Sequence, residues 1–359
     1  MQSKEETRAF LARYAREWPE LQIDDLIKLL YQSAFGCGHF VSSEARVRSF
    51  LEEETAGLAP DAALTLVEPI LGKYARVHLA PYAAQGMALK TLARLFMFAA
   101  NEAPAEDAAA WFEAALCLLQ EMADGGVLPF SGEAMRTQLD AYRAAGCPAL
   151  HHSEAFRAAY HPAYRVLRAQ DARLLGVFAR IDALLLQRER VIVAIDGNSG
   201  AGKSTLAGLI EKVYDGATVV HMDDFFLQPH QRTQERFDTP GGNVDHERFL
   251  EEVLSPMRRG KAFCYRPFDC ARMAIGAGRE IAPGRLCVVE GSYSLHPALE
   301  SAYDLKIVLR ISPAAQAERI LARNGAQMLG RFVNEWIPME NLYFEATRID
   351  ERADVIIGG

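Results

Sequence analysis

A glycine-rich segment in the middle of the chain constrains its fold more than any other feature. The run before it, residues 191–196, is apolar and β-branched, as in a strand that is buried on both faces. The run after it, residues 205–212, has the pattern of a helix. A strand, a glycine loop and a helix in this order predict a loop that binds phosphate groups. The segment fits the pattern G-x-x-x-x-G-K-[ST] and consists of Gly197, Asn198, Ser199, Gly200, Ala201, Gly202, Lys203 and Ser204.

Each part of this loop has a chemical role in binding the phosphates of ATP. Glycines let backbone N–H groups converge on phosphate oxygens, and the following helix N-terminus adds positive potential. We expect Lys203 to reach the β- and γ-phosphates and the Ser204 hydroxyl to bind Mg²⁺. The predicted ATP-binding residues are these eight positions and Thr205. The alternative is a glycine-rich turn that binds nothing, against which the flanking strand and helix argue.

Length and charge limit the classes of protein that this chain can represent. Its 359 residues suggest about two domains. A net charge of −8 argues against nucleic acid or an anionic membrane as the main partner. The first residues lack an apolar signal core and no stretch can span a bilayer, so we expect a cytoplasmic protein. The six cysteines form no C-x-x-C pair, which disfavours a disulfide framework. The sequence does not determine the oligomeric state, and it allows a homo-oligomer.

The two halves of the chain have different hydrophobic patterns. Residues 1–170 show helical spacing, with alanine- and leucine-rich stretches at 88–100 and 108–122, and predict an all-α domain of unknown function. Residues 171–359 begin with an amphipathic helix and then alternate short apolar runs with helices. This alternation predicts an α/β domain, with a parallel sheet covered by helices on both faces. The predicted strands are residues 191–195, 217–222, 286–289, 305–309 and 355–357.

Acidic residues follow two of the predicted strands. Asp223 and Asp224 come directly after the second strand, and Glu290 ends the third. The carboxyl ends of parallel strands face the crevice where ligands bind. One of the two aspartates can take a proton from an acceptor hydroxyl, and Glu290 can support Mg²⁺ directly or through water. The alternatives are a capping role for the aspartates and a surface position for Glu290.

Three arginines lie in and after a late predicted helix. Arg319 and Arg323 are four residues apart and therefore share one helix face, and Arg331 follows two glycines. Arginines at this point can close over the phosphates as a lid and offset the charge that develops during transfer. The alternative is a solvated helix face.

Several motifs in order resemble the uridine kinase and phosphoribulokinase group of P-loop kinases, over roughly residues 190–359. HMDDFF at 221–226 resembles the strand-end D-[SD]-F-[YF], and RFDTP at 236–240 resembles N-F-D-H-P. VEG at 289–291, RILAR at 319–323 and ADVII at 353–357 match further family segments. The resemblance implies a fold of P-loop type, with Asp223 as catalytic base and Asp238 in contact with the hydroxyls of the acceptor sugar.

One segment departs from the family pattern. The family reads the nucleobase with Y-D-F and a following His and Arg, whereas residues 265–272 read YRPFDCAR and contain no histidine. Tyr265 and Arg272 are the candidate substrate-binding residues in this segment. We therefore expect that uridine and cytidine are not the best acceptors.

Polar clusters in the first half allow three interpretations. They contain His39, Arg76, His78, His152 and Arg165, set between apolar helices. They can line a pocket for the acceptor or a regulator, form structural loops and contacts between domains, or bind a metal. No H-x-x-x-H or H-E-x-x-H spacing supports a metal site.

Taken together, the sequence predicts an ATP- and Mg²⁺-dependent kinase that phosphorylates a hydroxyl of a nucleoside-like or other small metabolite. Its predicted catalytic residues are Lys203, Asp223, Arg319, Arg323 and Arg331, with Ser204 and Glu290 at the metal. A nucleotide-gated regulatory or interaction protein with slow hydrolysis is the alternative from another class. A pantothenate-type or sugar-type kinase is the alternative within the class.

Overall fold

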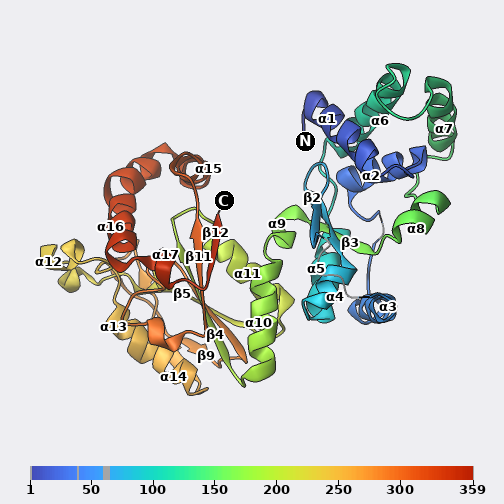
Figure 1. Ribbon diagram of the computed structural model, residues 1–359. Coiled ribbons are helices and arrows are strands. Elements are labelled where there is room, and N and C mark those ends of the chain that lie inside the picture. The colour runs from blue at the N-terminus through green and yellow to red at the C-terminus, as the bar shows by residue number, and fades with distance from the viewer. Residues whose placement is uncertain (1, 39, 60–64, 359) are drawn as a thin grey trace. The chain divides into compact units, whose positions relative to one another are not determined.

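The computed structural model describes residues 2–38, 40–59 and 65–358. The chain divides into two compact units, residues 1–179 and residues 180–359, which we call the N-terminal unit and the C-terminal unit (Figure 1). Each is described by itself below. The domain boundary that the sequence predicts between residues 170 and 171 stays a prediction.

The N-terminal unit is mostly helical, as the sequence predicts. Serine side chains begin several of its helices by accepting a backbone N–H bond, which satisfies one of the free donors of the first turn. The helices are α1 (Lys4–Glu17), α2 (Ile23–Phe35), α3 (Glu44–Ala56), α4 (Leu79–Ala84), α5 (Leu89–Ala100), α6 (Ala108–Asp124), α7 (Gly132–Ala144), α8 (Glu154–Tyr160), α9 (Ala169–Ala172) and α10 (Leu175–Gln187), of which α10 continues into the C-terminal unit.

The same unit also contains a small antiparallel sheet that the residue pattern does not predict. It consists of β1 (Val67–Pro69), β2 (Tyr74–His78) and β3 (Tyr164–Arg168), in the order β1-β2-β3. Four consecutive residues of β2 are buried, so the strand shows no alternation of polar and apolar positions. Its partner β3 lies far along the chain, with His78 opposite Tyr164. The region is therefore helical, as expected, but not exclusively so.

The C-terminal unit is built on a parallel sheet flanked by helices (Figure 1). The five strands correspond to the five predicted apolar runs, and their order is β12-β11-β4-β10-β5. Their bounds are β4 (Val191–Gly197), β5 (Thr218–His221), β10 (Leu286–Glu290), β11 (Leu305–Arg310) and β12 (Val355–Gly358). Every residue of β4 is buried, as expected for the central strand of a covered sheet.

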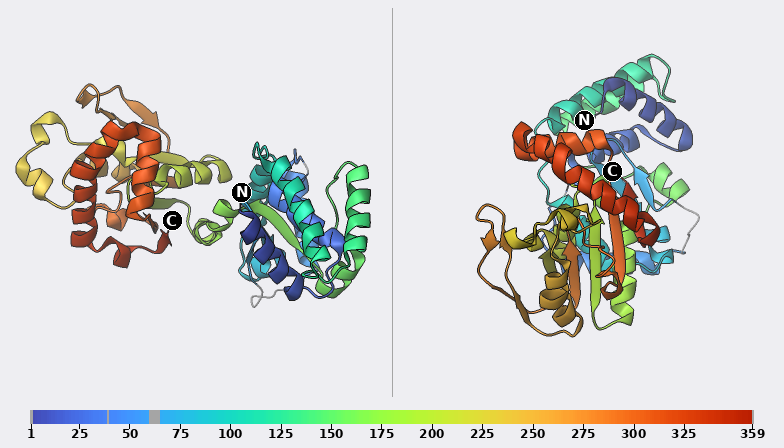
Figure 2. Two further views of the ribbon diagram at one scale, coloured as in Figure 1. Left: turned by 90° about the horizontal axis from the view of Figure 1, so that it is seen from above. Right: turned by 90° about the vertical axis from the view of Figure 1, so that its left-hand side faces the viewer.

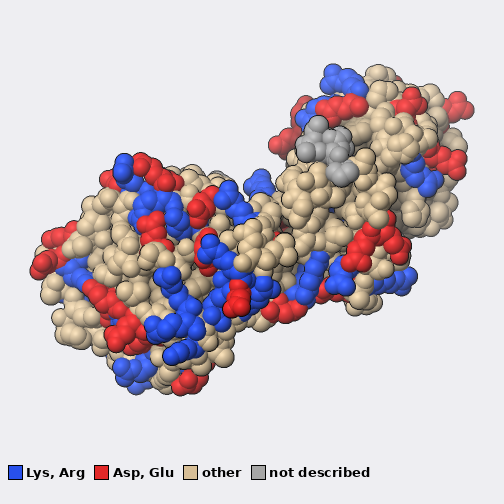
Figure 3. Space-filling view, turned by 60° about the horizontal axis from the view of Figure 1, so that its bottom comes forward, with Lys and Arg blue, Asp and Glu red and all other residues tan. Residues whose placement is uncertain are grey.

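Helices and short hairpins surround this sheet, and Figure 2 shows them from two further sides. The helices are α11 (Lys203–Val213), α12 (Gln234–Asp238), α13 (His246–Phe249), α14 (Ser255–Arg258), α15 (Pro313–Arg331), α16 (Ile337–Thr347) and α17 (Ile349–Arg352). The hairpins pair β6 (Phe263–Tyr265) with β9 (Arg279–Ile281), and β7 (Phe268–Asp269) with β8 (Ala274–Ile275). On the face of the molecule in Figure 3, acidic and basic side chains are intermixed.

The sheet register brings the ends of three strands together. Glu290, the last residue of β10, lies opposite Ile195 of β4 on one side and His221 of β5 on the other. The glycine loop follows β4, and Asp223 follows β5. The predicted phosphate, metal and base residues therefore share one edge of the sheet, where ligands bind in open α/β folds.

Candidate active site

The loop after β4 requires glycine at its two ends. Gly197 has a φ of 132°, and a Cβ there would lie 2.0 Å from the carbonyl oxygen of Leu309 on the neighbouring strand. Gly202 has a φ of 101° and begins α11 in the left-handed region. The chain can therefore turn tightly from the strand into the helix, so that the loop is followed directly by a helix N-terminus.

Lys203 lies along this loop and is held by three oxygen atoms. Its ammonium group donates to the carbonyl oxygens of Gly197 at 2.8 Å and Asn198 at 3.1 Å, and to the Ser292 hydroxyl at 3.2 Å. The residue is only 8% exposed. These bonds fix a positive charge beside the loop, where a phosphate group needs one.

Ser204 and Glu290 form a compact set of oxygen ligands. The Ser204 hydroxyl donates to the Glu290 carboxylate, whose oxygens lie 3.0 and 3.1 Å away. Nδ1 of His221 lies 2.5 Å from Oε1 of the same carboxylate, and this hydrogen bond is the main cause that raises the pKa of His221. A hydroxyl and a carboxylate are hard oxygen ligands of the kind that Mg²⁺ takes alongside phosphate.

Asp223 lies in the turn that follows β5, residues Met222–Phe225. Its side chain reaches the surface, yet protein groups crowd around the carboxyl. Loss of water raises its pKa, the nearby charges of Glu290 and Glu340 add to this, and the Lys203 ammonium opposes it. A carboxylate with a raised pKa is a stronger base than an ordinary aspartate.

Asp224, the next residue, lies in a different environment from Asp223. Its Oδ2 accepts hydrogen bonds from the Tyr265 hydroxyl and from Nη1 of Arg279, both at 2.8 Å. These contacts connect the turn after β5 to the hairpin of β6 and β9. Asp224 is therefore engaged as a structural acceptor, whereas no hydrogen bond of this kind involves the Asp223 carboxylate among the described residues.

Glu340 is a site residue that the sequence does not indicate. It lies on α16, is 2% exposed, and accepts from the backbone N–H of Ser199 at 3.1 Å, from the Ser199 hydroxyl, and from the Ser292 hydroxyl at 2.7 Å. It connects α16 to the phosphate-binding loop. A single glutamate in a late helical segment carries no motif, so only the folded chain reveals this contact.

Asp196 is a second residue without a predicted role. It is fully buried at the end of β4 and accepts from the backbone N–H groups of Gly197 at 2.7 Å, Tyr293 at 3.1 Å and Leu295 at 2.8 Å. The Tyr343 hydroxyl donates to it at 2.9 Å. Burial raises its pKa against the effect of these bonds. Its position directly before the glycine motif is the only sequence signal that could have pointed to it.

Of the three predicted lid arginines, one contacts the loop. Nη1 of Arg319 donates to the carbonyl oxygen of Gly200 at 3.2 Å. Arg323 donates to its neighbour Asn324, and Arg331 pairs with Glu335 at 3.1 Å. Gly325, with a φ of 80°, interrupts α15 between the first two arginines and the third. Helix α15 therefore consists of two helical parts, and Arg319 in the first part contacts the loop.

The three predicted acceptor residues are not gathered into one cluster. Tyr265 lies next to the turn after β5 through its bond to Asp224. Asp238 is exposed at the end of α12 and accepts from Gln234 at 2.8 Å. Arg272 is exposed in the turn between β7 and β8. Within the described residues, no hydrogen bond or ion pair joins Asp238 or Arg272 to the loop or to Asp223.

The polar clusters of the N-terminal unit divide into several contacts. Arg76 and His78 both contact Glu68, His152 contacts Asp25, and Arg165 pairs with Glu54. His39 lies outside the described residues. Over the described ranges, no three His, Cys, Asp or Glu side chains are grouped so that they could hold a metal ion.

Part of the chain is similar in sequence to known kinases. No family model matches the chain. A uridine kinase of Staphylococcus haemolyticus is 28% identical over 184 residues, which covers 46% of this chain and 86% of the relative. A uridine kinase of Staphylococcus aureus is 27% identical over 183 residues, with the same two coverages.

Solved structures give weaker likenesses. A putative fructose transport system kinase from Silicibacter sp. TM1040 is 25% identical, covers 51% of this chain and 95% of its own, and has a TM-score of 0.38. A possible uridine kinase from Bacillus stearothermophilus is 18% identical, covers 51% and 99%, and has the same TM-score. Scores this low support no inference.

The helices within the described ranges include none that is both long and apolar enough to cross a bilayer. The glycine loop, the parallel sheet and the likeness to uridine kinases over 46% of the chain together support a uridine kinase-like P-loop kinase with a hydroxyl acceptor.

Proposed function

We propose that this chain transfers the γ-phosphoryl group of ATP, with Mg²⁺, to a hydroxyl of a nucleoside-like or other small hydroxylated metabolite. The observation that carries the proposal is the convergence of three functions at one sheet edge. Lys203 lies beside the loop, Ser204 bonds to Glu290, and Asp223 follows the adjacent strand. A cytoplasmic location, which the sequence favours, is part of this proposal.

The residues of the loop fit a nucleotide triphosphate and its metal. The loop from Gly197 to Thr205 would hold the phosphates through the Lys203 ammonium and through backbone N–H groups such as those of Gly200 and Gly202, since the N–H groups of Gly197 and Ser199 already bond to Asp196 and Glu340. Ser204 and Glu290 would hold Mg²⁺. Bound ATP supplies the phosphoryl group, and the metal offsets the negative charge on its oxygens. The Ser204–Glu290 bond of 3.0 Å supports this assignment because it already brings two oxygen ligands together.

Asp223 acts in this proposal on the acceptor. Its carboxylate would accept the proton of the attacking hydroxyl, and its raised pKa favours that transfer. The Lys203 ammonium opposes this rise of the pKa. Asp224 would orient the turn through Tyr265 and Arg279 rather than take the proton.

The arginines of α15 would close over the phosphates. Arg319 already reaches the loop at Gly200, and the break at Gly325 gives the segment a point at which Arg323 and Arg331 can reorient. In the closed state their charges would stabilise the transferred group.

The proposal specifies only the chemical class of the acceptor, a small hydroxylated metabolite. Asp238 ends α12, Tyr265 ends β6 and Arg272 lies in the turn between β7 and β8, all in the segments after β5, which would face an acceptor. The relatives are uridine kinases by name, but the altered segment at residues 265–272 favours an acceptor other than uridine or cytidine.

An ATP-consumption screen across nucleosides, sugars and vitamins tests the proposal. We expect consumption that depends on one hydroxylated compound and on Mg²⁺. Slow consumption that no acceptor stimulates would contradict the proposal and favour the nucleotide-gated regulatory protein. A screen in which uridine exceeds all other compounds would leave the kinase assignment intact and overturn the expectation about the acceptor.

A further inference from the structure

The N-terminal unit contains a pocket whose lining includes none of the residues assigned to the kinase site. Its volume is about 640 Å³, and its lining residues all lie between Phe10 and Tyr164. The lining comes from α1, from the strands β1 and β2, and from α8 with the segment that follows it. This size is ordinary for a small-molecule site. The residues assigned to ATP, Mg²⁺ and the acceptor all lie in the C-terminal unit.

Aromatic rings form one wall of the pocket. The ring centroids of Trp18 and Phe156 are 5.5 Å apart, those of Trp18 and Tyr160 are 4.8 Å apart, and those of Phe156 and Tyr160 are 4.8 Å apart. Tyr14 and Tyr164 also line the pocket. Such rings offer flat apolar faces with negative electrostatic potential, which attract planar groups and delocalised cations.

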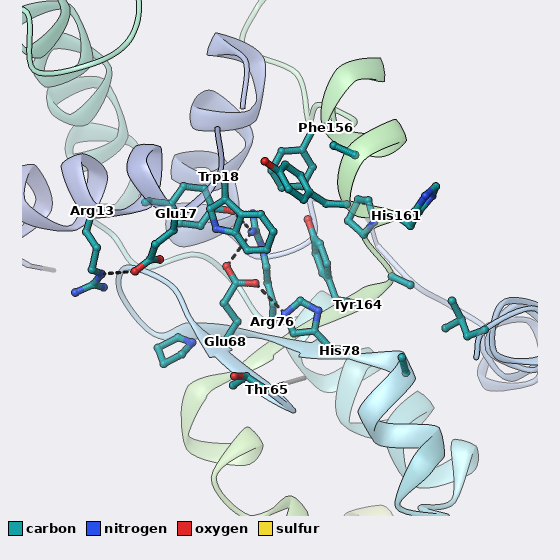
Figure 4. Close-up of a pocket in the computed structure, with 18 of the residues that line it drawn as sticks. Arg13, Glu17, Trp18, Thr65, Glu68, Arg76, His78, Phe156, His161 and Tyr164 are labelled. Atoms are coloured by element: carbon teal, nitrogen blue, oxygen red, sulfur yellow. Dashed lines mark hydrogen bonds and ion pairs between the residues drawn. The ribbon is translucent and has the colours of Figure 1, made fainter. Parts of the chain in front are cut away.

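The floor of the pocket is an ion-pair cluster on β1 and β2. Figure 4 shows the Glu68 carboxylate between Arg76 and His78. Arg76 is 1% exposed and donates to Gln32 at 2.8 and 3.0 Å, to the Tyr14 hydroxyl at 2.7 Å and to Glu68 at 3.2 Å. Four of its five N–H donors are therefore engaged by the protein, and its side chain is buried from a ligand in the pocket.

Glu68 is the charged group of the floor that remains partly accessible, whereas Arg13 and Glu17 line the pocket at more exposed positions. Its side chain is 18% exposed; Oε1 accepts from Arg76, and Oε2 lies 2.9 Å from Nε2 of His78. Each carboxylate oxygen has two lone pairs, so each retains one for a ligand. Burial alone would raise the pKa of Glu68, but the bonds with His78 and Arg76 outweigh it and lower the pKa, which keeps the group ionised.

The wall and floor are held in place by a second set of buried bonds. The Tyr164 hydroxyl lies 2.6 Å from Nε2 of His152, and Nδ1 of His152 lies 2.7 Å from Oδ1 of Asp25. The Arg76 guanidinium lies 4.7 Å from the centroid of the Tyr164 ring. The pocket is formed before a ligand arrives.

We propose that this pocket binds a small planar molecule whose edge carries N–H donors with a delocalised positive charge, such as an amidine, a guanidine or an amino-substituted heterocycle. Its flat face would lie against Trp18 and its aromatic neighbours, and its N–H edge would donate to Glu68. This site is separate from the proposed kinase function and can be tested without any turnover.

Calorimetry on the full chain with benzamidine tests this proposal, and benzoate serves as the anion of the same shape. We expect benzamidine to bind and benzoate not to bind. Glu68→Gln should weaken benzamidine by about tenfold or more, because a hydrogen bond to a charged group is lost. Glu17→Gln is the matched control, since Glu17 lines the same pocket at an exposed position beside Arg13 and should change affinity little.

A second variant keeps the test decisive if Glu68→Gln disturbs the cluster. Trp18→Leu removes an aromatic face and leaves the polar floor intact, and it should also weaken benzamidine; thermal unfolding checks that both variants are folded. The proposal is overturned if benzamidine does not bind, if benzoate binds more tightly, or if folded Glu68→Gln and Trp18→Leu variants bind benzamidine as the wild type does.

Discussion

At the residue scale, the candidate site combines positions that the sequence pattern predicts with positions that it does not predict. Lys203, Ser204, Glu290 and Asp223 could be predicted because each occupies a fixed place relative to a strand end or a glycine motif. Glu340 could not, since its contact with Ser199 spans 141 residues of sequence. Local patterns carry no information about such a contact, which depends on how α16 packs.

Lys203→Ala should lower phosphoryl transfer by roughly 10²–10³-fold, the usual effect of removing one donor to a developing charge. Lys203 is buried and bonded to two loop carbonyls, so circular dichroism and thermal unfolding must accompany the assay. A folded variant with near-normal turnover would contradict the assignment of the loop.

Glu340→Gln should lower the free energy of unfolding by about 1–3 kcal/mol, because a buried charged acceptor of three hydrogen bonds is replaced by a neutral amide. Chemical denaturation measures this change. Glu345→Gln, an exposed position on the same helix, is the control and should have little effect. Equal destabilisation by the two variants would show that the contact with the loop contributes nothing special.

At the element scale, the five strands of the parallel sheet could be predicted, whereas the short hairpin strands β6 to β9 and the strands of the N-terminal unit could not. Buried parallel strands are continuous apolar runs, so residues 191–195 and 286–289 stand out in the sequence. By contrast, β2 contains a buried arginine, and β3 is recognisable only by its pairing with β2. Their sheet arises from long-range packing between helices, which periodicity does not report.

The hydrogen bond between Asp25 of α2 and His152, which lies just before α8, should make the N-terminal unit sensitive to acid. Burial lowers the pKa of His152 below its ordinary value, opposed by the bond to Asp25 and reinforced by the charges of Arg76 and Lys28. The folded state therefore favours the neutral ring. Its contribution to stability is full above the unfolded pKa of about 6.5 and decreases as the pH falls below that value.

Thermal unfolding of the full chain between pH 8 and pH 5 measures this effect. His152→Gln should reduce the acid-dependent loss of stability, whereas His151→Gln, an exposed neighbour, should not. If the wild type and His152→Gln lose stability equally over this range, the buried ring does not cause the acid sensitivity.

At the scale of the whole molecule, the two units carry different sets of chemical groups. The residues proposed to handle phosphate lie between Gly197 and Arg331, and the pocket with Glu68 at its floor lies in residues 1–179. The sequence predicts the phosphate-handling residues in the second half of the chain, but it does not identify the pocket, whose wall and floor come from elements that are distant in sequence.

A chain of residues 172–359, which keeps α10 whole, should therefore bind ATP with Mg²⁺ as the full chain does, with a dissociation constant within about threefold, a difference of only about 0.65 kcal/mol. Calorimetry on both chains makes the comparison. A shortened chain that is folded by circular dichroism and yet does not bind ATP would show that the N-terminal unit takes part in nucleotide binding.

The central claim is that Asp223 activates a hydroxyl for phosphoryl transfer, and transfer of label from γ-³²P-ATP to the acceptor found by screening tests it most directly. Asp223→Asn should lower kcat by on the order of 10²–10⁴-fold with ATP binding nearly unchanged, because a general base is lost. Asp224→Asn should have a smaller effect, through its bonds to Tyr265 and Arg279. Label found only in inorganic phosphate would contradict the account. A kcat that Asp224→Asn lowers strongly and Asp223→Asn leaves nearly normal would also contradict it.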